Sequence, residues 1–571
     1  MAPSSRQSKR GAGWAPPVGP TLPPGSWPRL LAGRFRPRAK PFKWVSFDAL
    51  SKSYNDLLTR FAGERIVHEQ RRRWLRDLAA LSERFPDLTV DRSDLAEPTF
   101  VIVGDPGEGD ASQYCVAAAL RSVRPVDFMV LCSDVIYPAG DVNDYPDRFY
   151  VPYADFPGTI YGLPGNHDWY DLLHGFHEHF CDARSTREFP GVHGWRERIA
   201  RLLWRPGGKP DTAVIEPLRA SSPPWRASPV RPAQPGPYYA IDTGPLRLVC
   251  IDTGVRGELD AEQGEWLRRV SAGERPKVLL TGRPLLVDYA YRPGRIAGGE
   301  QTVDDIVRDP ANHYVAAIGG DIHNYQHYPV DCSVGTAGRR IEYVVSGGGG
   351  AYMSATHGLD PATSPRLPDG VGFPAEDDIR LYPLRGDSLA FYARQVVPFL
   401  RRSLITMTLV TAGFVALALL LALVSVPAAV AVGILALPPT ALLAYLLRIG
   451  AARTLVLPAH VRNGEVDPDV AASWLARRYR LPPRRKLVEV PRSAERVLEL
   501  VMPLRQRGLL VRLLSEVFDS DEPPFFKHFL LVKVRNGDLV IECRSVTGWA
   551  DAELNPPVED RITIRLDASA S

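Results

Sequence analysis

Four short segments carry polar side chains whose types and order suit a site for metal ions. They are Gly104-Asp105-Pro106-Gly107, Ser133-Asp134-Val135-Ile136-Tyr137, Gly165-Asn166-His167-Asp168 and Gly320-Asp321-Ile322-His323. Any one of them alone is typical of an ordinary turn or helix cap. Together they offer carboxylate, amide, phenol and imidazole ligands. Such ligands can hold two divalent ions about 3.5–4 Å apart, which clamp a phosphoryl group and make hydroxide available.

The elements that must position these segments are short apolar runs, which are typical of buried strands. The runs span residues 99–103, 128–132, 159–163, 246–251, 278–280, 314–318 and 341–345. Helix-like stretches alternate with them, and each of the four polar segments directly follows one run. Functional loops lie at the carboxyl ends of strands in layered α/β folds. We therefore expect an α/β fold that gathers the four segments in one place.

In this order the segments resemble the calcineurin-like metallophosphoesterase superfamily, and most closely its purple acid phosphatase branch. The resemblance covers about residues 98–357, with Glu262-Gln263, Trp266-Leu267, Gly347–Gly350 and Thr356-His357 as further similarities. Many members begin with Asp-x-His, where this chain has Asp105-Pro106-Gly107. The branch also lacks that histidine and has a tyrosine three residues after the second aspartate, as Tyr137 follows Asp134. The resemblance implies a four-layer αββα metallophosphoesterase sandwich.

The resemblance also implies a ligand set for each of two metal ions. The first ion takes Asp105, Asp134, Tyr137 and His323. The second takes bridging Asp134, Asn166 and two histidines, but this chain has Gly282 and Asp321 at the histidine positions. The ions are divalent or of mixed valence, drawn from Fe, Mn, Mg or Zn.

Three interpretations of the two replaced histidines stay open. Asp321 can serve as a ligand through oxygen, and an all-oxygen second position favours Mg²⁺, Mn²⁺ or Ca²⁺ over Zn²⁺. Alternatively, one ion binds and catalysis is slow, or the fold is kept for binding without hydrolysis. Gly282 has no side chain to offer in any of them.

Three further features bear on catalysis. His167 with Asp168 resembles the family's general acid pair, and a histidine suits protonation of a leaving alkoxide near neutral pH. Arg283 either contacts a phosphate oxygen or is an ordinary surface arginine. His174, His177 and His179 have helical spacing, which fits a metal-binding face or, as we favour, a polar helix at the rim of the site.

An uncharged run decides the expected location of the protein. Residues 403–447 contain no Asp, Glu, Lys, Arg or His. One helix of this length would be about 67 Å long, whereas the hydrocarbon core of a bilayer is about 30 Å thick. We therefore expect two spans, at 404–424 and 428–447, with a turn near Pro427. Arginines flank both ends of the run, which places both ends in the cytoplasm.

The rest of the chain agrees with that placement. Residues 1–47 carry nine Lys and Arg but no Asp or Glu and are rich in Pro, so we expect a disordered basic head. The six cysteines are scattered without a CxxC pair, which favours a reducing compartment. No basic groove interleaved with aromatic residues indicates nucleic acid. We expect an integral protein of a bacterial-type cytoplasmic membrane, with the catalytic domain and both termini cytoplasmic.

The expected organisation has five parts. They are the head at 1–47, a catalytic domain at 48–384, the transmembrane hairpin within 385–460, a cytoplasmic helical insert at 461–520 and C-terminal strands at 521–571 that complete the catalytic domain. Two apolar runs flank Asn536-Gly537, a strong hairpin signal, and a third strand is expected at 561–566. A charged helix is expected at 60–85, and the nine prolines of 205–237 indicate an irregular loop.

The function that follows is hydrolysis of a phosphate ester at the cytoplasmic face of a membrane. The resemblance implies that metal-bound hydroxide attacks phosphorus while His167 protonates the leaving group. The partners expected are the phosphate ester and the lipid bilayer. The alternative is a catalytically impaired module of the same fold, acting as a membrane-tethered binding or regulatory protein.

Overall fold

The computed structural model describes residues 51–388, apart from short gaps of which 222–232 is the longest. It also describes 525–546, 556–566 and a few residues between 412 and 430. The head at 1–47, the insert at 461–520 and most of the two expected membrane spans lie outside the described residues. Within the described part, no helix is both long enough and apolar enough to cross a membrane.

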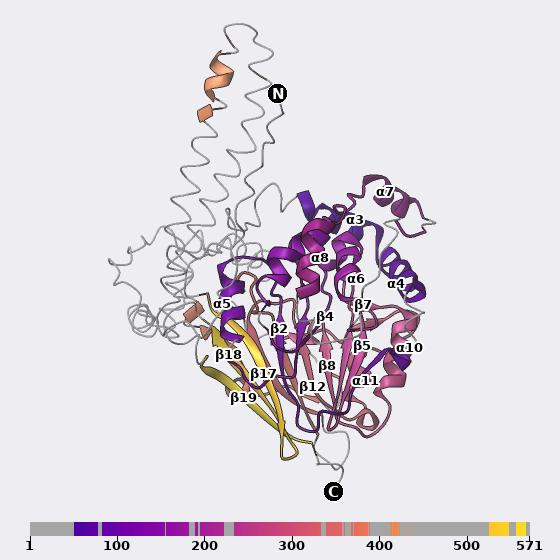
Figure 1. The fold of residues 1–571 in the computed structure, drawn as a ribbon, viewed down its shortest axis with the longest axis vertical. Helices are drawn as coiled ribbons and strands as arrows, with labels where there is room; N and C mark the ends of the chain where they lie inside the picture. The colour runs from indigo at the N-terminus through magenta and orange to yellow at the C-terminus, as the bar shows by residue number, and fades with distance from the viewer. Residues whose placement is uncertain are drawn as a thin grey trace, which may run out of the picture. The chain divides into compact units, whose positions relative to one another are not determined.

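In the part of the chain that the structure describes, one mixed sheet of six strands joins distant segments (Figure 1). Its order is β19 (Val558–Arg565), β18 (Asp538–Val546), β17 (Lys527–Arg535), β2 (Thr99–Gly104), β3 (Phe128–Cys132) and β4 (Thr159–Leu163). The strands β2, β3 and β4 run parallel and are buried along their whole lengths, as strands covered on both faces must be. The strand β17 pairs antiparallel with β2, where Leu530 lies opposite Ile102.

The second mixed sheet has nine strands within the described residues. Its order is β1 (Thr89–Arg92), β5 (Tyr239–Thr243), β6 (Arg247–Ile251), β8 (Lys277–Thr281), β12 (Tyr314–Gly319), β14 (Arg340–Ser346), β13 (Tyr325–Cys332) and β15 (Val371–Gly372), with β16 (Arg380–Tyr382) also paired to β13. Two small ribbons pair β9 (Leu286–Val287) with β10 (Ala290–Tyr291), and β7 (Glu258–Leu259) with β11 (Arg295–Ile296). The parallel neighbours β6, β8, β12 and β14 form the centre of this sheet.

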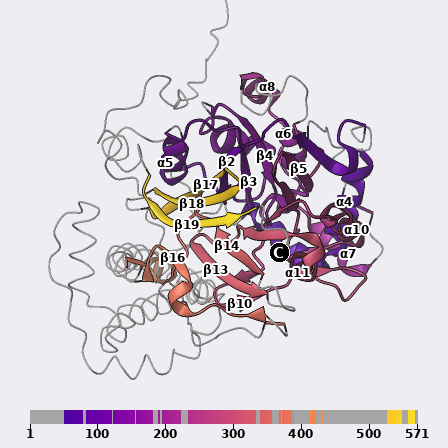
Figure 2. The same cartoon turned by 90° about the horizontal axis from the view of Figure 1, so that it is seen from below.

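The two sheets contact each other, and helices cover their outer faces. The Tyr239 hydroxyl donates to the Gly162 carbonyl at 3.0 Å, and Cys132 Sγ donates to the Thr281 carbonyl at 3.5 Å, so β4 touches β5 and β3 touches β8. The helix α5 (Ala111–Leu120) packs on the six-stranded sheet, whereas α10 (Ala261–Ser271) and α11 (Val303–Arg308) pack on the nine-stranded sheet (Figures 1 and 2). The described fold is therefore mixed α/β with two large sheets.

The other described helices lie near the loops that follow β3 and β4. They are α3 (Tyr54–Ala62), α4 (Arg65–Asp77), α6 (His174–Phe180), α7 (Trp195–Leu203) and α8 (Thr212–Ser221). Single-turn helices are η3 (Pro86–Leu88), η4 (Val142–Asp144), η5 (Pro146–Tyr150), η6 (Asp168–Asp171), η7 (Pro310–Asn312) and η8 (Glu376–Asp378). The described residues divide into two units, and both large sheets belong to the larger one.

Two local expectations were wrong. The helix expected at 60–85 is instead two helices, α3 and α4, because Gly63 separates them with a φ of 89° that favours glycine. The proline-rich stretch at 205–237 is not wholly irregular, since α8 forms within it and contains Pro217. The hairpin prediction is confirmed: β17 and β18 turn at Asn536-Gly537, where both residues have positive φ.

Candidate metal centre

The four polar segments lie at the carboxyl ends of strands, as expected. Asp105 follows β2, Asp134 follows β3 and Asn166 follows β4, so these three residues leave neighbouring parallel strands. Asp321 and His323 follow β12 of the other sheet. The contact between the sheets therefore brings the four loops together.

The backbone of this centre is strained. Asp105, Asp134 and Asp321 have φ values of 52°, 36° and 65°, in the left-handed region that most side chains avoid. Such residues cost of the order of 1–3 kcal/mol each and cluster at functional sites. The loops also approach closely, because a Cβ on Gly165 would overlap the Asp134 carboxylate and one on Gly347 would overlap the Asp105 carboxylate. The strained backbone that holds these carboxylates in place therefore lowers the stability of the fold.

Four side chains meet at the Tyr137 hydroxyl. Its oxygen lies 3.2 Å from Asp105 Oδ1, 3.1 Å from Asp134 Oδ2 and 3.1 Å from His323 Nε2, and all four residues are buried. These are the four residues expected to hold the first ion. A phenol has one proton to donate, so it cannot donate to both carboxylates at once.

The acidic side chains of this group lie close together and are buried, which raises their pKa values. Burial, and then the neighbouring carboxylates Asp134 and Asp321, raise the pKa of Asp105 well above its usual value. Burial also raises the pKa of Asp134 and of the Tyr137 phenol. Asp105 Oδ2 is buried without a hydrogen-bond partner. Buried carboxylates are normally paired with cations or coordinate metals, so this acidic group favours a cation.

The donor set fits a divalent ion at the first position. Two carboxylates, a phenol and an imidazole converge, and one carboxylate oxygen has no other partner. Ion binding would offset the burial and the carboxylate repulsion that together raise the pKa values of Asp105 and Asp134. Among the described residues, however, no group of three or more His, Cys, Asp or Glu side chains is arranged to hold a metal. The fit therefore depends on Tyr137, whose hydroxyl joins the other three.

The residues expected to hold the second ion interact with other side chains. Asn166 donates its amide N–H to the Tyr170 hydroxyl at 2.8 Å. Asp321 forms an ion pair with Arg283, whose Nε lies 3.8 Å from Asp321 Oδ1. A Cβ on Gly282 would come within 2.7 Å of Thr253 Oγ1, so a larger residue there would displace Thr253.

His167 and Asp168 have separate surroundings. His167 Nδ1 donates to the Pro138 carbonyl at 2.8 Å, which makes Nε2 the nitrogen that gains or loses a proton. The backbone N–H of His167 donates to Asp134 Oδ1 at 2.8 Å, which fixes the position of His167 relative to this candidate metal ligand. The His167 ring is therefore held beside the metal centre by its backbone and by Nδ1.

Asp168 binds backbone rather than the His167 ring. Its carboxylate accepts N–H groups from Val135 at 2.8 Å, Ile136 at 3.0 Å and Gly165 at 2.9 Å. It thus joins the loop after β3 to the loop after β4. Burial, and then the charge of Asp134, raise its pKa to about 8 despite these donors. Asp168 positions the two loops that carry the other residues.

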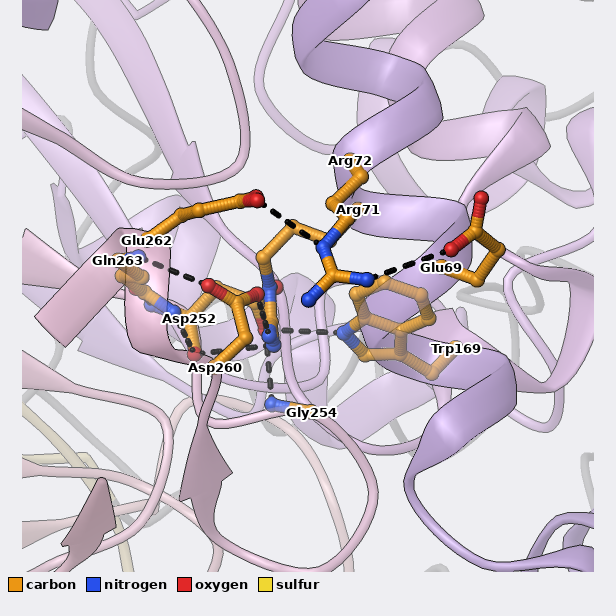
Figure 3. Close-up of polar contacts among 9 residues, drawn as sticks. All are labelled: Glu69, Arg71, Arg72, Trp169, Asp252, Gly254, Asp260, Glu262 and Gln263. Atoms are coloured by element: carbon orange, nitrogen blue, oxygen red, sulfur yellow. Dashed lines mark hydrogen bonds and ion pairs between the residues drawn. The ribbon is translucent and has the colours of Figure 1, made fainter. Parts of the chain in front are cut away.

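A buried ion-pair network around Arg71 was not anticipated from the sequence (Figure 3). Arg71 of α4 is fully buried and donates to Asp252 Oδ2 at 2.9 Å and to Asp260 Oδ2 at 2.7 Å. Asp252 also accepts from Trp169 Nε1 at 2.9 Å, and Trp169 lies two residues beyond His167. Arg71 stands in a run of three arginines, so nothing in the local pattern distinguishes it from its partly exposed neighbours.

The three histidines of α6 do not form the polar rim that we favoured. His177 and His179 are fully buried in the described structure. The His177 ring stacks on Trp74, and the His179 ring stacks on Tyr145 and hydrogen-bonds the Tyr150 hydroxyl at 2.7 Å. Burial lowers the pKa of His179 to about 3, so this ring is neutral. These two histidines pack as aromatic residues.

Solved structures that are similar to part of this chain include the following two. Purple acid phosphatase PPD1 from yellow lupin (Lupinus luteus) seeds is 17% identical over 46% of each chain, with a TM-score of 0.28. PhoD is 13% identical over 46% of this chain and 59% of its own, with a TM-score of 0.27. The chain thus matches about half the length of either structure. No family model matches the chain, and no curated protein does.

Proposed function

We propose that this protein is a metal-dependent phosphoesterase built on a four-layer αββα sandwich. The observation that carries the proposal is the convergence of Asp105, Asp134 and His323 on the Tyr137 hydroxyl. A divalent ion bound there would polarise a phosphoryl oxygen and lower the pKa of a water molecule. The substrate class is a phosphate ester.

The chain's own residues have distinct tasks in this reaction. Asp105, Asp134, Tyr137 and His323 would hold the ion. His167, with Nδ1 bound to the Pro138 carbonyl, presents Nε2 to carry the proton that the leaving oxygen needs. Asp168 keeps the loops after β3 and β4 in register through three backbone N–H groups.

The test is a matched measurement of metal content and turnover. Purified wild-type protein, loaded with Mn²⁺ and dialysed, should hydrolyse a generic aryl phosphate, and Asp134→Asn should lose both bound metal and turnover. His167→Asn should keep its metal and lose turnover by about 10²–10⁴-fold, the usual contribution of a general acid. Equal turnover of wild type and Asp134→Asn would reject the proposal.

We also propose that the catalytic unit is anchored in a membrane and faces the cytoplasm. The uncharged run at 403–447 with arginines at both ends supports two spans, at 404–424 and 428–447. The pairing of β17 with β2 supports a catalytic unit made of residues 48–384 and 521–571, with the segment between them inserted. Resistance of the full chain to carbonate extraction from membranes tests the anchor. Release of the chain by carbonate would reject it.

The alternative is a module that binds a phosphate ester without cleaving it. The ion pair between Asp321 and Arg283 favours this alternative, since it occupies a carboxylate that a second ion would use. Binding of inorganic phosphate by the metal-loaded protein, with no turnover of any aryl phosphate, would select it.

A further inference from the structure

We propose that this centre takes one divalent ion and that the guanidinium of Arg283, beside Asp321, supplies the second positive charge for the phosphate. The inference rests on the proposed function. It gives a role to the side of the site that carries Asp321 and Arg283, next to the four residues expected to hold the first ion.

The turn that carries Arg283 is built to hold it beside the loop after β12. Thr281, the last residue of β8, donates its hydroxyl to the Arg283 carbonyl at 2.9 Å. Pro284 lies so close to Gly319 that a Cβ on Gly319 would overlap it. Gly319 ends β12, and Asp321 follows two residues later. The backbone of Arg283 is therefore fixed next to Asp321.

The side chain of Arg283 is placed for an anion. Its Nε is buried and has no hydrogen-bond partner, although it lies 3.8 Å from Asp321 Oδ1. One quarter of the side chain is exposed, so the group can be reached from solvent. A guanidinium presents several N–H donors in a planar fork that matches phosphate oxygens. Since Nε faces Asp321, the donors that a phosphate oxygen can use are the other N–H groups of the guanidinium.

The charges on this side of the centre disfavour a second metal ion. Asp321 belongs to the same acidic group as Asp105 and Asp134, since its charge raises the pKa of both. Arg283 already neutralises it in part, and a divalent ion next to a guanidinium would be repelled. Gly282 adds no ligand, and a Cβ there would meet Thr253 Oγ1. Donor side chains converge at the position of the first ion, whereas the position expected for a second ion already has the Arg283 guanidinium beside it.

The test measures ion stoichiometry and phosphate affinity separately. Wild-type protein saturated with Mn²⁺ and passed over a desalting column should retain one ion per chain, measured by mass spectrometry of the metal. Calorimetric titration of that protein with inorganic phosphate should show binding, and Arg283→Gln should weaken it about ten- to hundredfold at unchanged ion content, the usual range for losing a charged hydrogen bond. Arg283→Lys keeps the positive charge but lacks the planar guanidinium, so its phosphate affinity should lie between those of wild type and Arg283→Gln.

The matched control is Arg256→Gln, which removes the same charge from an exposed arginine in the loop that packs against Arg283. It should leave phosphate affinity unchanged. Two ions per wild-type chain would overturn the inference while leaving the proposed function standing, and so would an Arg283→Gln affinity equal to that of wild type. No retained ion in the wild type would instead reject the proposed function. If Arg283→Gln does not fold, Arg283→Lys decides the matter by the same comparison.

Discussion

Replacing Arg71 with methionine should destabilise the protein far more than the same change one residue later. Arg71 is fully buried and is the cation shared by Asp252 and Asp260 (Figure 3). Although burial acts to raise the pKa of Asp260, the Arg71 guanidinium holds it below its usual value, so this carboxylate is ionised near neutral pH. Methionine fills similar volume but leaves both carboxylates without their cation.

The magnitude follows from the burial of the three groups. Breaking a buried ion pair by removing one partner costs about 3–5 kcal/mol, because the remaining charge is uncompensated. Two carboxylates share Arg71, so we expect a loss of about 4 kcal/mol or slightly more, a large part of a typical total of about 5–15 kcal/mol. Arg72 is the control on the same helix. It pairs with Glu262 at 3.1 Å, but both side chains are about half exposed, and such pairs contribute about 0–1 kcal/mol.

The assay is urea unfolding of each variant, followed by tryptophan fluorescence. Arg71→Met should shift the midpoint strongly, and Arg72→Met should scarcely move it. Adding Asp252→Asn and Asp260→Asn to Arg71→Met should recover part of the loss, since the stranded charges are then gone. If the free energy of unfolding of Arg71→Met lies within about 1 kcal/mol of that of Arg72→Met, Asp252 and Asp260 do not depend on Arg71 for compensation of their charge.

Three further predictions concern the metal centre and the contact between the sheets. Mn²⁺ at about 100 times its dissociation constant should stabilise wild type by about 2.7 kcal/mol, and equal stabilisation of Asp134→Asn in thermal unfolding would exclude Asp134 as a ligand. Asp168→Asn should cost about 1–3 kcal/mol in urea unfolding, since the amide cannot accept all three N–H groups, and an unchanged midpoint would contradict its positioning role. His327 lies between Asp560 and Glu342 at 2.8 and 2.7 Å, and these partners raise its pKa although burial acts to lower it. The stability that the protonated His327 ring contributes is complete below the unfolded pKa of about 6.5, and it is lost as pH rises through the higher folded pKa. Wild type should therefore lose more stability than His327→Gln between about pH 6 and about pH 9. Parallel pH profiles of the two proteins would count against this assignment.

The strands that the sequence predicts best are those whose pattern is purely local. The expected strands at 128–132 and 159–163 coincide with β3 and β4, because a short apolar run bounded by polar residues has few alternatives. β13 was missed because it contains Pro329, Gln326 and His327 yet is buried. Its polar groups are satisfied by distant partners such as Asp560, which no local window contains.

The candidate site divides in the same way. Asp105, Asp134, Tyr137 and His323 could be predicted together, since each motif directly follows an apolar run and the structure places all four around one hydroxyl. The roles of neighbours could not be predicted, because they depend on side-chain direction. Asp168 faces backbone amides, which its place next to His167 does not indicate.

The pairing of β17 with β2 has a consequence for synthesis of the chain. β2 leads directly into Asp105, and its neighbour on one side arrives only when residues 527–535 have been made. Until then β2 is an open edge, to which other chains can add. Every candidate site residue lies before residue 324, so a ribosome has translated all of them long before the sheet can close. A message truncated beyond that point would thus encode the complete site and yield a product prone to aggregate.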